Sequence, residues 1–241
     1  MKYYQKGKQI SYGEPIGILL IENYVPYIPG DVANATSYDF PVRFKELPGF
    51  TPERLFAHDT SLVEEAIAAG RSLVEAGVRA ITGDCGFLAL YQNRIAEELG
   101  VPVFLSSLLQ LDFMHRIVSP RKKIGVVTAN KASLDRTVLD AVCSVPDERL
   151  VISGLEEKKH FVSAVFSEDG MLDSEIVERE VLEAVTEMGA YDLGAILLEC
   201  SLLPPYAAAV QEATGLPVFD YNTMITYVYR SVSATRYTGL L

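Results

Sequence analysis

The stretch AITGDCGFLALYQNRIAEELGVPVF at residues 80–104 aligns without a gap with AILLECSLLPPYAAAVQEATGLPVF at residues 195–219. Ten of the 25 aligned positions are identical, where average amino-acid usage would give roughly one or two. The match predicts a duplicated unit of strand, loop, helix and strand. In each copy a cysteine, Cys85 or Cys200, follows a short apolar strand.

Short β-branched runs alternate with longer helical patterns along nearly the whole chain. We expect strands at 15–21, 79–83, 101–105, 123–128, 150–153, 195–198 and 216–220, and helices at 61–77, 87–99, 133–142, 174–188 and 205–214. This alternation is typical of parallel sheets covered by helices. It predicts an α/β fold of two similar Rossmann-like lobes, each a mostly parallel sheet flanked by helices, related by a pseudo-twofold axis.

The lobes are expected to divide near residue 119, where the Ser-Pro-Arg sequence at 119–121 interrupts the pattern. A second, shorter similarity, between IGILL at 16–20 and IGVVT at 124–128, identifies the opening strand of each half. We expect residues 1–119 to form the first lobe and residues 120–220 the second, with residues 221–241 returning as a helix to complete the first. The exposed part of that helix is the surface that a homo-oligomer would use.

Composition narrows the class of partner. The 241-residue chain has a formal net charge of −11 and no run of Lys or Arg, which argues against nucleic acid as a partner. The longest apolar run near the start is too short to span a bilayer, and no signal-peptide core follows the first residues. We therefore expect a cytoplasmic protein with no membrane partner.

Three widely spaced cysteines are unlike either a disulfide framework or a zinc site. We expect reduced thiols and no bound metal. Cys143 has no counterpart in the repeat, which favours a packing role for it.

The positions of Cys85 and Cys200 predict an acid/base pair. Ligands of open α/β sheets bind at the carboxyl ends of strands, and a helix N-terminus favours a thiolate, so we expect the pKa of each thiol to fall towards neutrality. Gly83 would let the strand turn, and Gly86 would let a ligand approach the backbone. A thiolate and a thiol on opposite faces of a carbon acid could remove and deliver a proton.

Two further segments could contact a substrate. Thr128 and Asn130 end a strand and offer a hydroxyl and an amide to an anion, or else they cap the next helix. Residues 23–52 form a long aromatic-rich stretch that we expect to be an ordered flap. Within it, Arg43 could bind a carboxylate or lie on the surface.

Three segments resemble the aspartate/glutamate racemase superfamily: TGDCGF at 82–87, KKIGVVTAN at 122–130 and LLECSLLPPYAAAVQEATGLPVFD at 197–220. Its members include amino-acid, hydantoin and allantoin racemases, maleate isomerase and arylmalonate decarboxylase. The resemblance implies a cofactor-independent two-lobe enzyme with Cys85 and Cys200 between the lobes and a small-molecule carboxylate as substrate.

This chain departs from the amino-acid racemases of that superfamily beside each cysteine. It has Gly-Phe at 86–87 and Ser-Leu at 201–202 where they have Asn-Thr and Thr-His, and Glu-Asn at 22–23 where they have an aspartate and a serine. These changes disfavour free glutamate as the substrate. The candidate substrate-binding residues are Glu22, Asn23, Arg43, Gly83, Asp84, Gly86, Phe87, Thr128, Asn130 and Ser201.

The leading hypothesis is a cofactor-independent racemase or isomerase that uses both thiols. The first alternative is a decarboxylase or lyase of the same superfamily that uses one cysteine. The second is a ligand-binding or redox-sensing protein without turnover, although the absence of a C-x-x-C motif counts against redox sensing.

Overall fold

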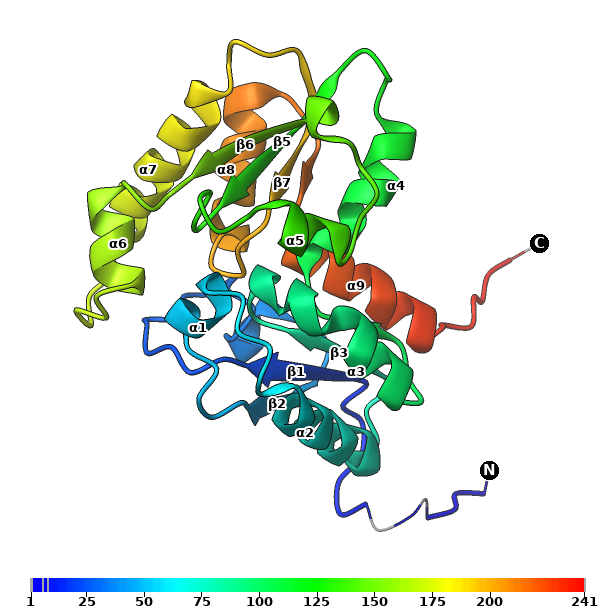
Figure 1. Ribbon diagram of the computed structural model, residues 1–241. Helices are drawn as coiled ribbons and strands as arrows, with labels where there is room; N and C mark the ends of the chain where they lie inside the picture. Colours follow the sequence, from blue (N-terminus) through cyan, green and yellow to red (C-terminus); the bar gives the residue numbers. More distant parts are fainter. Residues whose placement is uncertain (1, 6, 8, 241) are drawn as a thin grey trace.

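The computed structural model describes residues 2–5, 7 and 9–240. These residues form two lobes, one above the other in Figure 1, and each lobe is built on a four-stranded parallel sheet. The strands are β1 (Ile16–Leu20), β2 (Val42–Glu46), β3 (Ala80–Gly83), β4 (Val103–Phe104), β5 (Lys123–Thr128), β6 (Leu150–Gly154), β7 (Leu193–Leu198) and β8 (Val218–Phe219). The predicted α/β class with two similar lobes is confirmed.

The two sheets have the same topology, with the orders β2-β1-β3-β4 and β6-β5-β7-β8. In each, the strand that opens the lobe pairs with the strand that precedes a cysteine: β1 with β3, and β5 with β7. Apolar runs such as IGILL are almost wholly buried, as expected for strands covered on both faces. Seven strands lie where the sequence predicts them; β2, inside the expected flap, was not predicted.

The helices are α1 (Pro52–Phe56), α2 (Val63–Ala76), α3 (Gln92–Glu98), α4 (Gln110–Ile117), α5 (Arg136–Asp140), α6 (Lys159–Val165), α7 (Ser174–Glu187), α8 (Ala207–Thr214) and α9 (Tyr221–Val232). Their ends follow local sequence signals. Gly77, with φ of 101°, ends α2 in the left-handed conformation. Asp220 and Thr223 form a capping box that starts α9 directly after β8. Among the described residues, no helix has the length and apolar character needed to cross a membrane.

The helix that follows each repeat, α4 or α9, packs against the other lobe. Leu111 and Met114 of α4 belong to a core that includes Ile124 and Leu197 of the second sheet, beside which α4 lies in Figure 1. In return, α9 packs on β3, and its buried residues share a core with Ile16 and other residues of the first sheet. The division of the chain at residue 119 stays a prediction, because α4 shares its core with strands that come after that point.

Residues 23–34 join the lobes in front of the two sheets. The Val32 N–H donates to the carbonyl of Ser201 at 3.3 Å, and the Tyr24 N–H donates to Oε1 of Glu168 at 2.9 Å. Val25 is buried within the core of the second lobe. The first part of the expected flap is therefore an ordered connection, while its last part is the edge strand β2.

The return of α9 to the first lobe can be tested by its contribution to stability. Ile225 is fully buried in the core shared with β1, so we expect Ile225→Ala to lower the free energy of unfolding by about 2–5 kcal/mol. Tyr227 lies on the same helix with 75% of its surface exposed, and Tyr227→Ala should cost less than about 0.5 kcal/mol. Urea unfolding measures both; equal effects would contradict the packing of α9 on the first sheet.

Candidate active site

The carboxyl ends of β3 and β7 meet at one cavity between the lobes. Each strand is followed by an acidic residue and then a cysteine, and both Cys85 and Cys200 line the cavity. The cavity holds about 40 Å³, room for roughly three waters at 10–15 Å³ each. The two cysteines that the sequence places at equivalent points of the repeat therefore lie at one site, whose walls must part to admit a larger molecule.

Aromatic rings form much of the wall. They are Tyr27, Phe56, Phe87 and Phe166. The Phe56 ring packs edge-on against Phe87, with centroids 4.9 Å apart, and against Phe166, with centroids 5.7 Å apart. Because Phe87 belongs to the first lobe and Phe166 to the second, this cluster holds the two halves of the cavity together. The lining residues in the described part of the chain include no Lys, Arg or His.

Two buried carboxyl groups, Asp84 and Glu199, are the charged groups of the wall. They have 4% and 1% of their surface exposed. Burial raises the pKa of each carboxyl to about 7, although the Ile21 N–H lowers that of Asp84 and the Thr128 hydroxyl lowers that of Glu199. Neither has an ion-pair partner among the salt bridges of the described residues. Both can therefore gain or lose a proton near neutral pH.

The expected lowering of the thiol pKa is wrong for the ligand-free cavity. Burial raises the pKa of Cys85 and of Cys200, and the negative charge of Glu199 raises both further. The backbone N–H groups of Phe87 and Leu88 act on Cys85 in the expected direction, and that of Leu202 acts on Cys200. These dipoles are outweighed because an ionised thiolate is costly in a buried position beside carboxylates.

Gly86 has a specific steric role beside Cys85. A Cβ atom at this position would overlap Oε1 of Glu199. The absence of a side chain therefore lets the Glu199 carboxylate of the second lobe approach the Cys85 loop of the first. Gly86 thus makes room for a protein carboxylate, while the expected approach of a ligand to its backbone stays a prediction.

Several predicted substrate-binding residues do lie in the wall of the cavity: Asn23, Asp84, Gly86, Phe87 and Ser201. The buried Oδ1 of Asn23 has no hydrogen-bond partner in the described structure. The Ser201 hydroxyl donates to the carbonyl of Asp84 and so ties the two cysteine loops together. The binding roles of these residues stay predictions.

Arg43 does not lie at the site. It stands opposite Gly17 on the edge strand β2, and its guanidinium pairs with Glu14 at the other end of the sheet. Glu22 is also outside the wall of the cavity, since its carboxylate accepts from the Gly49 N–H at 2.8 Å. Arg43 lies away from the cysteines because the course of residues 23–52 could not be deduced from the sequence pattern, whereas Glu22 lines a neighbouring hollow that shares Asn23 and Tyr27 with the cavity.

Three more predicted residues lie behind the wall. Leu88 covers Gly83. The Thr128 hydroxyl is buried and donates to Oε2 of Glu199 at 2.8 Å. Asn130 accepts from the Ser133 N–H at 3.0 Å, which is the local capping role that its sequence position allows. None of the three lines the cavity.

Among the wall residues that were not predicted from the sequence, those with charged or aromatic side chains are Glu199, Tyr27, Phe56 and Phe166. A signal for Glu199 was present, because the repeat aligns it with Asp84 and so places an acidic residue before each cysteine. No comparable signal marks the aromatic residues, which reach the cavity from a connection and two short helices.

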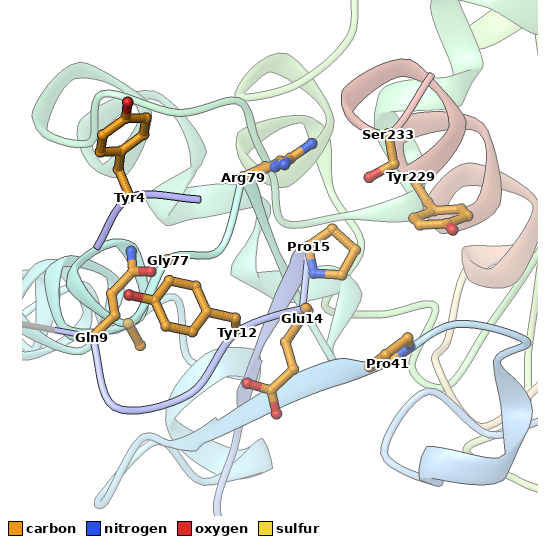
Figure 2. A pocket seen from close by; sticks show the side chains of 12 residues that line it. Tyr4, Gln9, Tyr12, Glu14, Pro15, Pro41, Gly77, Arg79, Tyr229 and Ser233 are labelled. Atoms are coloured by element: carbon orange, nitrogen blue, oxygen red, sulfur yellow. The ribbon is translucent and has the colours of Figure 1, made fainter. Parts of the chain in front are cut away.

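A larger hollow of about 440 Å³ lies at the opposite, amino end of the first sheet (Figure 2). Tyr4, Tyr12, Arg79 and Tyr229 are among its lining residues, and Arg79 donates to the carbonyl of Val232. Ligands of parallel α/β sheets bind beyond the carboxyl ends of the strands. The smaller cavity at the cysteines is therefore the better candidate for the active site.

Comparison with curated proteins finds lyases. Dimethylsulfoniopropionate lyase 3 of Emiliania huxleyi (strain CCMP1516) is 34% identical over 218 residues, which cover 86% of this chain and 57% of that protein. Dimethylsulfoniopropionate lyase of Durusdinium sp. clade D is 29% identical over 216 residues, covering 85% of this chain and 70% of that protein. The chain thus spans little more than half the length of the first relative. No protein-family model matches the chain.

Solved structures with the same fold include racemases and a decarboxylase. Unliganded arylmalonate decarboxylase has a TM-score of 0.61 at 16% identity, covering 93% of this chain and 94% of that one. Glutamate racemase of Francisella tularensis subsp. tularensis SCHU S4 in complex with D-glutamate has a TM-score of 0.57 at 17% identity, with 93% and 85% covered. Picrophilus torridus aspartate racemase has a TM-score of 0.56 at 12% identity, with 94% and 96% covered. The chain therefore shares the fold of arylmalonate decarboxylase and of the glutamate and aspartate racemases.

Proposed function

We propose that this protein is a lyase that releases dimethyl sulfide from dimethylsulfoniopropionate or a close sulfonium analogue. The sequence similarity to dimethylsulfoniopropionate lyases extends over 86% of the chain and includes both cysteine segments. A lyase is the one-cysteine alternative within this superfamily, and it is preferred to the racemase.

The chemistry requires one base. The substrate carries a carboxylate at one end and a dimethylsulfonium cation at the other, separated by two methylene groups. A base removes a proton from the carbon next to the carboxylate, the electron pair of that C–H bond forms the C=C bond, and the C–S bond breaks with its electron pair passing to sulfur. The products are acrylate, neutral dimethyl sulfide and the protonated base. Because the leaving group is neutral, no acid is needed to assist its departure.

The proposal rests on the kinds of side chain that line the cavity. Four aromatic rings and two carboxyl groups line the cavity, and the described lining residues include no cationic side chain. Aromatic faces and carboxylates stabilise a desolvated cation such as sulfonium. Substrates with two carboxylates, as in glutamate or aspartate, would instead meet repulsion from Asp84 and Glu199.

Cys85 is the better base of the two thiols. It is half-buried, whereas Cys200 has 8% of its surface exposed. Two backbone N–H groups point at Cys85 and one at Cys200. A sulfonium cation entering the cavity would offset the negative charge of Glu199 and the cost of burial, so binding would lower the thiol pKa. In this scheme the free enzyme holds a thiol and the substrate itself promotes the thiolate.

The polar groups of Asn23 are suited to the carboxylate end of the substrate. Its side chain lines the cavity, and its buried Oδ1 has no hydrogen-bond partner in the described structure. A rotation of the amide would present Nδ2 as a donor to a carboxylate. The flanking connection would have to move with it, since the cavity holds about 40 Å³.

A racemase that uses both thiols is the second candidate. The observation in its favour is that Cys85 and Cys200 line the same cavity. It requires both thiols to exchange protons with the substrate, whereas the elimination requires one.

Release of dimethyl sulfide from dimethylsulfoniopropionate, measured by gas chromatography, tests the proposal directly. We expect Cys85→Ala to lower kcat by about 10²–10⁴-fold because the base is lost. Cys200→Ala should have a smaller effect, through packing and orientation. The racemase instead predicts that chiral carbon acids exchange their α-proton with solvent deuterium, and that this exchange is lost in both variants; that result without any dimethyl sulfide would refute the lyase.

The aromatic wall predicts selectivity for a cation. Phe56 contacts both Phe87 and Phe166, so Phe56→Leu should raise the KM for dimethylsulfoniopropionate by about 10-fold or more, as expected for loss of a desolvated cation–π contact. Inhibition by 4-methylpentanoate, the analogue of similar shape that lacks the sulfonium charge, should be weak in the wild type and little changed in the variant. Phe113→Leu, at an exposed ring outside the cavity, is the matched control. A similar loss of affinity for both ligands would indicate a purely apolar pocket.

We expect the Asp84 carboxylate to lower the stability of the fold at neutral pH and to contribute to binding of the cationic substrate. Burial raises its pKa to about 7, so the folded state holds the proton more tightly than the unfolded state. The free energy of unfolding therefore falls as the pH rises from about 4 to about 7, by up to about 4 kcal/mol. Asp84→Asn should remove this loss, giving a higher Tm than the wild type at pH 8, no gain at pH 4 and a higher KM. Calorimetry and kinetics check both effects; a lower Tm at pH 8 would contradict the assignment.

A further inference from the structure

The Glu199 carboxylate has one buried oxygen without a partner, and that oxygen is directed at the Cys85 loop. Its Oε2 accepts from the Thr128 hydroxyl at 2.8 Å, whereas its Oε1 has no hydrogen-bond partner in the described structure. Oε1 lies against Gly86, the residue after Cys85, and the side chain lines the cavity. An unsatisfied buried carboxylate oxygen is costly and calls for a functional explanation.

The backbone holds Glu199 in this orientation from both lobes. Its N–H donates to the carbonyl of Val127 at 2.8 Å, and its carbonyl accepts from the Ser107 hydroxyl at 2.8 Å. With Oε2 held by Thr128 as well, little freedom remains for the side chain to turn away. The free oxygen is therefore a fixed feature of the cavity.

The elimination creates a need for a proton acceptor. Each turnover leaves one proton on the base, and a buried thiol beside carboxylates holds that proton tightly. Regeneration of the thiolate requires a neighbouring group that can take up this proton and pass it on to solvent. Glu199 is placed to be that group.

We propose that Oε1 of Glu199 accepts the thiol proton of Cys85 as the thiolate forms at the start of each turnover; this inference rests on the proposed lyase function. The S–H bond breaks with its electron pair staying on sulfur, and the O–H bond forms at Oε1. The proton leaves to water when the walls part for product release. No oxidant, reductant or further reactant is required.

The acid/base behaviour of the site depends on the groups that face Glu199. Burial raises its pKa to about 7, so it is a competent acceptor above neutral pH. The other titratable groups that face it or line the same cavity are Tyr27, Asp84, Cys85, Cys200 and Tyr221. Of these, Asp84 is the other group whose pKa is raised to about 7, so an experiment must separate the two.

The kinetic test compares Glu199→Gln with Glu156→Gln. Glu156 is a matched control because it lies in the same lobe, outside the cavity wall, and its Oε2 is also buried without a hydrogen-bond partner among the described residues. Glu199→Gln should lower kcat for dimethyl sulfide release by about 10²-fold or more, in addition to any rise in KM from the lost negative charge, whereas Glu156→Gln should leave both unchanged. A rise in KM without a fall in kcat would show that Glu199 only attracts the cation and would overturn the proposal.

The pH profile separates Glu199 from Asp84. In an Asp84→Asn background, kcat should still rise between about pH 6 and 8, because Glu199 must be ionised to accept the proton. Adding Glu199→Gln should flatten that rise, and adding Glu199→Asp should restore part of it. An unchanged rise in the Glu199→Gln double variant would refute the assignment.

A second readout does not depend on lyase activity. Alkylation of Cys85 by iodoacetamide, with mass spectrometry of its peptide at pH 8, reports how readily the thiol loses its proton. If Glu199 accepts that proton, Glu199→Gln should slow alkylation by about 10-fold. If Glu199 acts only as a negative charge, its removal should lower the thiol pKa and speed alkylation, which would overturn the proposal, as would an unchanged rate. Circular dichroism checks that each variant is folded.

These experiments distinguish two kinds of failure. If the wild type releases no dimethyl sulfide but alkylation slows in Glu199→Gln, the lyase assignment is wrong while the proton transfer between Glu199 and Cys85 stands. If the wild type releases dimethyl sulfide and Glu199→Gln leaves kcat and alkylation unchanged, the lyase stands and the proton-acceptor role is wrong.

Discussion

The burial of two carboxyl groups without cationic partners is the constraint on which this structure depends. Asp84 and Glu199 are almost fully enclosed where the two sheets meet, and each precedes a cysteine. Ionised carboxylates in such surroundings are expensive, so both hold protons up to about neutral pH. A cation in the cavity would be stabilised by these carboxylates, because its opposite charge offsets part of the free-energy cost of burying them. The site is therefore poised to respond to the charge of the molecule that enters it.

The lobes are tied together by the segments that carry this chemistry. The Ser201 hydroxyl bonds to the backbone of Asp84, and the Ser107 hydroxyl bonds to the backbone of Glu199. Residues 23–34 cross from the first lobe to the second, and α4 and α9 each pack with the opposite half. Any opening of the cavity is thus coupled to contacts between the lobes.

The similarity of this chain both to racemases and to lyases can be explained by one chemical step that the two reactions share. Proton removal next to a carboxylate is the first step in either reaction, and the fold supplies a thiol at the end of each central strand. The fate of the resulting carbanion depends on the substrate: one without a leaving group is reprotonated, and one with a neutral sulfide beside it expels the sulfide. In this chain the wall of the cavity is aromatic and acidic, and the proposed lyase function rests on that character.

The chain's own pattern determined the duplicated unit, the two parallel sheets, the return of the C-terminal helix and the equivalent placement of the two cysteines, because these arise from local periodicity and from the repeat. Tertiary structure alone decided the rest. Arg43 pairs at the far end of β2, while Phe56 and Phe166 reach the cavity from distant helices, because side-chain neighbours depend on how the connections run. The direction in which the Cys85 pKa shifts was also decided by tertiary structure. The local backbone dipoles lower this pKa, but desolvation by the whole fold and the Glu199 carboxylate beside Gly86 raise it more.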